Sequence, residues 1–202
     1  MTLLTPYHLD ALKELVNIGV GKAADSLNIL LDSHIQLEVP SISVFQGEDI
    51  AEGEDSIWGS ELACVQLGFR GHFNGSAILV FPPASAVKLV ASLTGEDPAA
   101  PFLNAVMAGT LNEVGNIVIN SVIGTIGNIL VKPFDFSLPD YMEGRLVDLL
   151  TTKNSAETLT VLLVKTHFRI HDRQVEGSII LLFELGSFDA LLTAIDTIAV
   201  SA

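Results

Sequence analysis

The chain carries one short pattern twice: a Glu, an Asn three positions later, and a Pro 23 positions after the Asn. The two copies are Glu14, Asn17 and Pro40, and Glu113, Asn116 and Pro139. A single Glu-x-x-Asn has little meaning, because any solvated helix face can contain it. Two copies with the same downstream Pro indicate a duplicated unit, so we expect the chain to fold as two similar halves.

The similarity between the halves extends beyond this pattern. Residues 73–81 (FNGSAILVF) resemble residues 175–183 (VEGSIILLF). We therefore place the repeats at about residues 6–97 and 103–200, joined by a short turn segment that contains Gly and Pro. Repeats of this kind usually share one core, and a single domain over residues 1–202 is expected.

Each repeat is predicted to contain a long helix, a strand that leads to the Pro, two further strands and a closing helix. Helices are expected at about 6–31, 83–94, 103–130 and 186–197, with Thr5 as the N-cap of the first. Strands are expected at about 35–45, 61–70, 74–82, 134–138 onward, 157–170 and 175–183. Short connections between successive strands favour antiparallel pairing. The predicted fold class is α+β: two pseudo-symmetric repeats that share a mainly antiparallel sheet, with two long motif-bearing helices packed on it.

Composition excludes several classes of protein. Hydrophobic residues make up 49% and charged residues 17%, which is typical of a folded chain with a large core. The net charge of −14 repels nucleic-acid phosphates and anionic membrane surfaces, so we expect neither nucleic-acid binding nor membrane insertion. The only cysteine, Cys64, lies in an apolar run and is expected to be buried. One cysteine and no recognisable export signal favour a cytoplasmic location.

The first long helix is predicted to have one polar face that carries the motif. At about 100° per residue, Asp10, Glu14 and Asn17 fall within an arc of about 60°. Gly21 continues this stripe. The opposite side is apolar, so Glu14 and Asn17 should lie side by side and point away from the core.

The second long helix repeats this geometry with a different set of neighbours. Glu113 and Asn116 share one face with Gly109, Asn120 and Gly124. This face is rich in small and amide side chains, whereas an ordinary solvated helix carries Lys, Arg and Glu.

Four glycines within the two long helices need a physical reason, because each costs about 1 kcal/mol relative to alanine. They are Gly19, Gly21, Gly124 and Gly127. Close approach of a partner molecule is one explanation, and tight packing inside the protein is the other. Gly19 lies off the polar stripe, which favours internal packing there.

The duplicated pattern resembles that of the CheC/CheX/FliY family of phosphatases from bacterial chemotaxis. That family has an acidic residue or Ser, then Glu, Asn and Pro at fixed intervals, and the first copy matches it at Asp10, Glu14, Asn17 and Pro40. The second copy matches at Glu113, Asn116 and Pro139. Two copies without the extra switch domain of FliY favour a CheC-like member. Gly109 departs from the pattern, and Asn120 replaces the Gly21 of the first copy; either change would weaken the second site or alter its partner.

This resemblance implies hydrolysis of the aspartyl phosphate of a CheY-like response-regulator receiver domain. The receiver would supply its own Mg²⁺ and Lys, and this chain would bind no metal or cofactor. Asn17 and Asn116 would then orient the attacking water, because an amide can accept a hydrogen bond from water and donate another. Glu14 and Glu113 would pair with the receiver's Lys. The two Pro residues are interpreted as markers of a turn behind each site.

Partner contacts and two alternative functions complete these expectations. Asp10 and Gly21 are expected to assist docking of the receiver at the first site. The same helices would also suit a non-catalytic adaptor that binds a receiver or the CheD deamidase. A structural component of the flagellar switch is a third possibility. No Walker loop, dinucleotide fingerprint or Gly-x-Ser-x-Gly elbow is present in the sequence.

Overall fold

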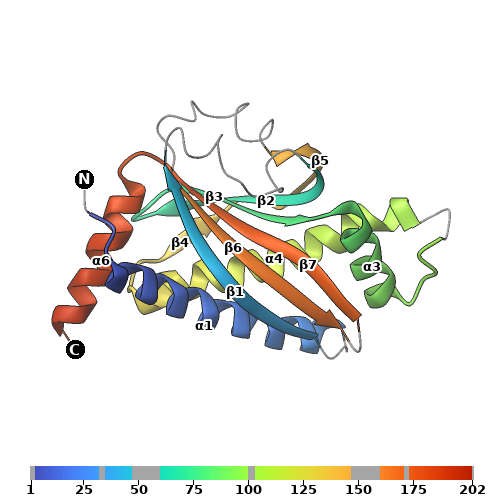
Figure 1. The fold of residues 1–202 in the computed structure, drawn as a ribbon, viewed down its shortest axis with the longest axis horizontal. Helices are drawn as coiled ribbons and strands as arrows, with labels where there is room; N and C mark the ends of the chain where they lie inside the picture. Colours follow the sequence, from blue (N-terminus) through green and yellow to red (C-terminus); the bar gives the residue numbers. More distant parts are fainter. Residues whose placement is uncertain are drawn as a thin grey trace.

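One seven-stranded sheet with helices packed on it forms the described part of the protein (Figure 1). The computed structural model describes residues 3–31, 35–46, 60–99, 103–146, 160–170 and 173–201. The strands are β1 (Ile35–Gln46), β2 (Glu61–Gly71), β3 (Gly75–Phe81), β4 (Phe134–Phe136), β5 (Asp140–Arg145), β6 (Thr160–Ile170) and β7 (Arg173–Phe183). Their order is β1-β6-β7-β3-β2-β4, with β5 also paired to β2, and every described pairing is antiparallel. The predicted α+β class with a mainly antiparallel sheet is confirmed.

Two long helices lie side by side against this sheet and run in opposite directions (Figure 1). The described helices are α1 (Pro6–Leu31), α3 (Pro83–Thr94), α4 (Leu103–Ile129) and α6 (Ser187–Ser201). The predicted long helices match α1 and α4 to within one residue. Within the described residues, no helix has both the length and the apolar character that crossing a membrane requires.

The two halves of the sheet exchange strands. The pair β3–β7 joins the hairpin β2–β3 of the first half to the hairpin β6–β7 of the second. Strand β1 then pairs with β6 of the second half, whereas β4 and β5 pair with β2 of the first. Each half therefore completes the sheet of the other, and the core cannot be divided at the middle of the chain.

Both motif prolines interrupt strand pairing. Pro40 lies inside β1, where the register with β6 shifts between Glu38 and Ser41. Pro139 lies between β4 and β5, where the strand predicted from residue 134 onward divides into two. Proline lacks the backbone N–H that a sheet ladder needs, so an irregularity is expected at each position. The prediction of a turn at Pro40 was wrong: the chain makes a bulge there and continues as a strand.

The larger core lies between the sheet and the helices. On β2, Ala63, Val65 and Leu67 point to this core, whereas Leu62 and Cys64 belong to a smaller apolar cluster on the other face. This alternation follows from the two-residue period of a strand. Cys64 is fully buried, as predicted.

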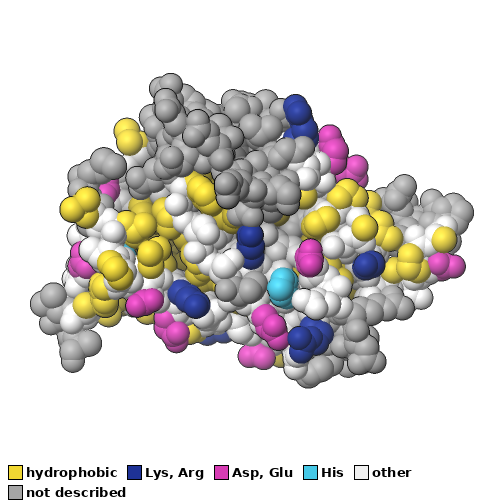
Figure 2. Space-filling view, in the orientation of Figure 1, with side chains coloured by type: hydrophobic (Ala, Val, Ile, Leu, Met, Phe, Trp, Pro, Cys, Tyr) yellow, Lys and Arg dark blue, Asp and Glu magenta, His cyan; other side chains and the backbone are white. Residues whose placement is uncertain are grey.

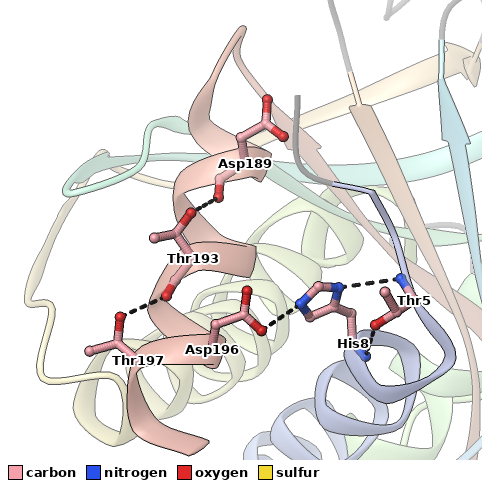
Figure 3. A network of polar contacts seen from close by, with 6 residues as sticks. All are labelled: Thr5, His8, Asp189, Thr193, Asp196 and Thr197. Carbon is pink, nitrogen blue, oxygen red and sulfur yellow. Dashed lines mark hydrogen bonds and ion pairs between the residues drawn. The ribbon is translucent and has the colours of Figure 1, made fainter. Parts of the chain in front are cut away.

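A buried histidine fixes the beginning of α1 to α6 (Figure 3). The backbone N–H of Thr5 donates to Nδ1 of His8, so the proton of the neutral ring lies on Nε2 and is donated to Asp196 Oδ1 at 2.8 Å. The N–H of His8 in turn donates to Thr5 Oγ1, which confirms Thr5 as the helix cap. His8 is only 3% exposed, so this contact sets how α1 enters the helical layer.

Candidate functional site

Helix α1 presents its motif residues to solvent. Asp10, Glu14, Asn17 and Gly21 are all exposed. The opposite side of the helix is buried at Leu12, Val16, Val20 and Ala23. Since packing fixes the apolar side against the sheet, the polar stripe has a defined orientation and faces outward.

The side chains of this first site have no partners among the described residues. Glu14 and Asn17 make no hydrogen bond or ion pair with any side chain that the structure describes. A carboxylate and an amide held three residues apart on one helix face are therefore available to another molecule. Together they offer a negative charge, one acceptor and one donor group.

The helical glycines divide into two groups. A Cβ at Gly19 would lie 2.7 Å from Val122 Cα, so α1 and α4 approach closely at this position. At Gly127 a Cβ would lie 2.6 Å from the backbone oxygen of Lys132. By contrast, a Cβ at Gly21 or Gly124 would meet nothing within 4 Å. Internal packing thus explains Gly19 and Gly127, as predicted for Gly19, and leaves an open surface at the other two.

Helix α4 carries the second copy in a different setting. Glu113 is exposed, and Asn116 is half-buried. The Nδ2 group of Asn120 donates a hydrogen bond to Oδ1 of Asn116 at 2.7 Å. Gly109 is exposed, and a Cβ there would meet nothing within 4 Å.

Sequence reasoning missed Asn112, which lies four residues before Asn116 on the same helix. Its Oδ1 is buried without a hydrogen-bond partner among the described residues, and the same holds for Oδ1 of Asn120. Residues four apart are neighbours on one helix face, so this spacing places all three amides on the same face of α4. The second site therefore has an amide on each side of Asn116.

The two sites face away from each other. On α1, Asn17 lies about 200° around the helix from Gly19, which contacts α4. On α4, Asn116 lies about 120° from Val122, which contacts α1. Because the helices run in opposite directions from this contact, the two asparagines are offset by about 12 Å along the helices. The motif copies form separate surfaces on opposite sides of the helix pair.

A concave feature away from both motif copies lies on the other face of the sheet. It has a volume of about 410 Å³ and is lined by Lys165, His167 and Glu176 among others. Figure 2 shows that acidic, basic and histidine side chains are mixed over the strands on this side. Across the described residues, no three His, Cys, Asp or Glu side chains group together as a metal site would require. Both acidic and basic side chains line this hollow, and none of the motif residues does.

Two family models match the chain. Residues 63–162 match the model described as chemotaxis phosphatase CheX, and residues 8–44 match that of the CheC-like family. The chain belongs to the CheC/CheX/FliY family. The CheC-like match contains Glu14 and Asn17, and the CheX match contains Glu113 and Asn116.

Curated relatives of this CheC/CheX/FliY protein agree. The chain is 23% identical over 200 residues to the CheY-P phosphatase CheC of Bacillus subtilis (strain 168). This alignment covers 93% of each of the two chains. It is 24% identical over 189 residues to the flagellar motor switch phosphatase FliY of the same organism. That match covers 90% of this chain and 47% of FliY, so the chain spans about half of that relative.

Solved structures show the same fold. Thermotoga maritima FliY has a TM-score of 0.75 at 17% identity, with 97% of this chain and 99% of FliY covered. The CheX–CheY–BeF3–Mg complex of Borrelia burgdorferi matches with a TM-score of 0.52 at 21% identity, over 84% of this chain and 98% of that chain. The FliM–SpeE complex of H. pylori matches at 0.66 with 11% identity, covering 96% and 97%. Since FliM shares the fold, the fold alone does not separate the members of this group, and the roles of the motif residues stay predictions.

Proposed function

We propose that this CheC/CheX/FliY-family protein is a phosphatase that removes the phosphoryl group from the aspartate of a CheY-like receiver domain. The observation that carries this proposal is the exposed pair Glu14 and Asn17 on one face of α1, without partners among the described residues. The pair recurs on α4 as Glu113 and Asn116. Phosphatase names among the relatives and the CheX–CheY complex support the same reaction and the same class of partner.

An aspartyl phosphate is an activated acyl phosphate, so the enzyme needs to add little chemistry. Water attacks phosphorus, the bond from phosphorus to the aspartate oxygen breaks, and the products are the aspartate carboxylate and inorganic phosphate. The surplus proton of the water ends on phosphate or in solvent. Positioning the water in line with the leaving oxygen is the main requirement, and developing charge is stabilised by groups already present.

The proposed roles follow from the functional groups of the motif. The carbonyl of Asn17 accepts a hydrogen bond from the attacking water and so fixes its position. The carboxylate of Glu14 forms an ion pair with the active-site Lys of the receiver and holds α1 across the receiver's active site. Asp10 adds a second negative charge to this contact, and Gly21 leaves room for the receiver's surface, because no atom lies within 4 Å of its missing Cβ.

Metal chemistry in this proposal belongs to the partner. We place Mg²⁺ on the receiver domain, where it would neutralise phosphate charge, and no cofactor on this chain. The proposed reaction takes place in the cytoplasm, and association with CheD is proposed as a further interaction of the same protein.

The second candidate function is a non-catalytic adaptor that binds a receiver or CheD through the same helices. The FliM-like fold favours this alternative, because that fold is shared beyond the phosphatases of the group. Both functions use α1 and α4 as docking surfaces. They differ in whether Asn17 and Asn116 are needed after the partner has bound.

The deciding experiment measures the decay of a phosphorylated CheY-like receiver with and without this protein. We expect wild type to accelerate decay and the double variant Asn17→Ala, Asn116→Ala to lose at least about 90% of the acceleration, since loss of one positioning group costs on the order of 10²-fold. Asn128→Ala is the matched control, because Asn128 is an exposed asparagine of α4 outside the motif face. Binding of the receiver without faster decay would replace the phosphatase by the adaptor.

A further inference from the structure

We propose that the Asn120 amide donates a hydrogen bond to the carbonyl oxygen of Asn116 that the attacking water would use. This contact makes the second site weaker than the first. This inference rests on the proposed phosphatase function and adds to it a residue that sets the balance between the two sites. Asn120 is a positioning residue in this proposal, because it acts through Asn116 and not on the phosphoryl group.

The carbonyl oxygen of Asn116 is already engaged. Asn120 lies one helical turn further along α4, and its Nδ2 donates to Asn116 Oδ1 at 2.7 Å. A water aligned for attack would have to use the same oxygen as its acceptor. This oxygen has two lone pairs, and the Asn120 amide, which is covalently held in place, takes one of them and limits the directions from which the water can bind.

The surroundings of Asn120 favour this bond. The Oδ1 atom of Asn120 is buried without a partner among the described residues. Within that part of the chain, the side chain of Asn120 is therefore hydrogen-bonded through its Nδ2 group, to Asn116. Breaking that bond would leave this half-buried amide without a side-chain partner, which is unfavourable. Asn112, four residues before Asn116, has a buried Oδ1 without a partner among the described residues, so this oxygen accepts no hydrogen bond from Asn116 there.

The first site lacks this competitor. Gly21 stands at the position equivalent to Asn120, and a Cβ there would meet nothing within 4 Å. Asn17 is exposed and has no side-chain partner among the residues described. The same catalytic pair is thus open on α1 and partly blocked on α4.

The test isolates the second site by adding Asn17→Ala to every variant. Decay of the phosphorylated receiver is measured with three variants. The first carries Asn17→Ala alone, the second adds Asn120→Ala, and the third adds both Asn116→Ala and Asn120→Ala. Removal of the Asn120 amide is expected to raise second-site activity about two- to tenfold, the range that one neutral hydrogen bond supports. The triple variant should lose this gain, because the gain acts through Asn116.

A reciprocal test installs the amide at the first site. In an Asn116→Ala background, Gly21→Asn and Gly21→Ala both place a Cβ at an open position, but only Gly21→Asn supplies a donor four residues after Asn17. We expect Gly21→Asn to be about two- to tenfold less active than Gly21→Ala. A pH profile of unchanged shape would agree with lost positioning and not with an altered ionisation.

Three results would overturn this inference. If Asn120→Ala lowers second-site activity, the two amides are turned end for end and Asn120 assists Asn116. If Asn120→Ala leaves it unchanged while wild type accelerates decay, the bond has no effect on catalysis, and the proposed phosphatase function still stands. Wild type without any effect on decay would instead remove the proposed function and this inference with it.

Discussion

Asn17 and Asn116 are identical residues at equivalent positions, yet their amides have different surroundings. Asn17 is exposed, whereas Asn116 is half-buried and bonded to Asn120. The difference comes from one position in each helix, Gly21 or Asn120. A motif therefore identifies which residues are available for chemistry, while the residue one turn away decides whether its functional group is free.

Cys64 shows how burial removes chemistry from a residue. The side chain is fully buried, and burial raises the pKa of its thiol to about 12. Because the thiolate is the nucleophile, the reactive form is absent from the folded protein at neutral and mildly alkaline pH.

We predict that Cys64 does not react with a thiol reagent such as iodoacetamide in the folded protein between pH 7 and pH 9. Labelling should become complete in denaturant, where the pKa returns to about 8.5. Mass spectrometry of the labelled chain measures both states. Fast labelling without denaturant would show that the β2 region opens readily.

At the scale of helices, two glycines of α1 have opposite roles. Gly19 allows α1 to contact the backbone of α4, whereas Gly21 faces open space. Alanine at the first position would overlap Val122 Cα, a backbone atom that cannot rotate away. Alanine at the second position meets nothing and gains the intrinsic helix preference.

Gly19→Ala is therefore expected to lower the free energy of unfolding by about 1–3 kcal/mol, as for overpacked cores. Gly21→Ala should raise it by about 0.5–1 kcal/mol. Denaturant unfolding followed by circular dichroism measures both variants against wild type. Equal effects of the two substitutions would contradict the close helix contact at Gly19.

At the scale of the whole molecule, the orientation of the two helices decides how many partners fit. Asn17 and Asn116 lie on sides of the helix pair that face away from each other, and their helices run antiparallel. We therefore expect a receiver bound at one site to leave the other accessible. Duplication in this arrangement would supply two docking surfaces.

We predict that one chain binds two receiver domains held in their phosphorylated-like state with beryllium fluoride. Isothermal titration calorimetry should give two receivers per chain for wild type and one for Glu14→Arg or Glu113→Arg, because charge reversal repels the receiver's Lys. Glu184→Arg, an exposed charge reversal outside both helices, serves as the control. Saturation of wild type at one receiver would mean that the sites overlap.

The sequence alone predicted most of the elements and the family. Hydrophobic periodicity defined α1 and α4 to within one residue because both helices are long and strongly patterned. The exposed stripe from Asp10 to Gly21 followed from the same periodicity. Fixed spacing of Glu, Asn and Pro carried the family assignment, since that spacing depends on positions along the chain and not on contacts.

Only the tertiary structure decided what depends on neighbours distant in sequence. It paired β1 with β6 and placed β4 and β5 beside β2, an exchange that local patterns do not encode. It also showed that Gly19 is closely packed and Gly21 is not, because the space around a missing Cβ depends on how the helices pack. The bond between Asn116 and Asn120 depends on rotamers that burial selects. The sequence therefore determined which groups lie on each helix face, and packing determined which of them remain free.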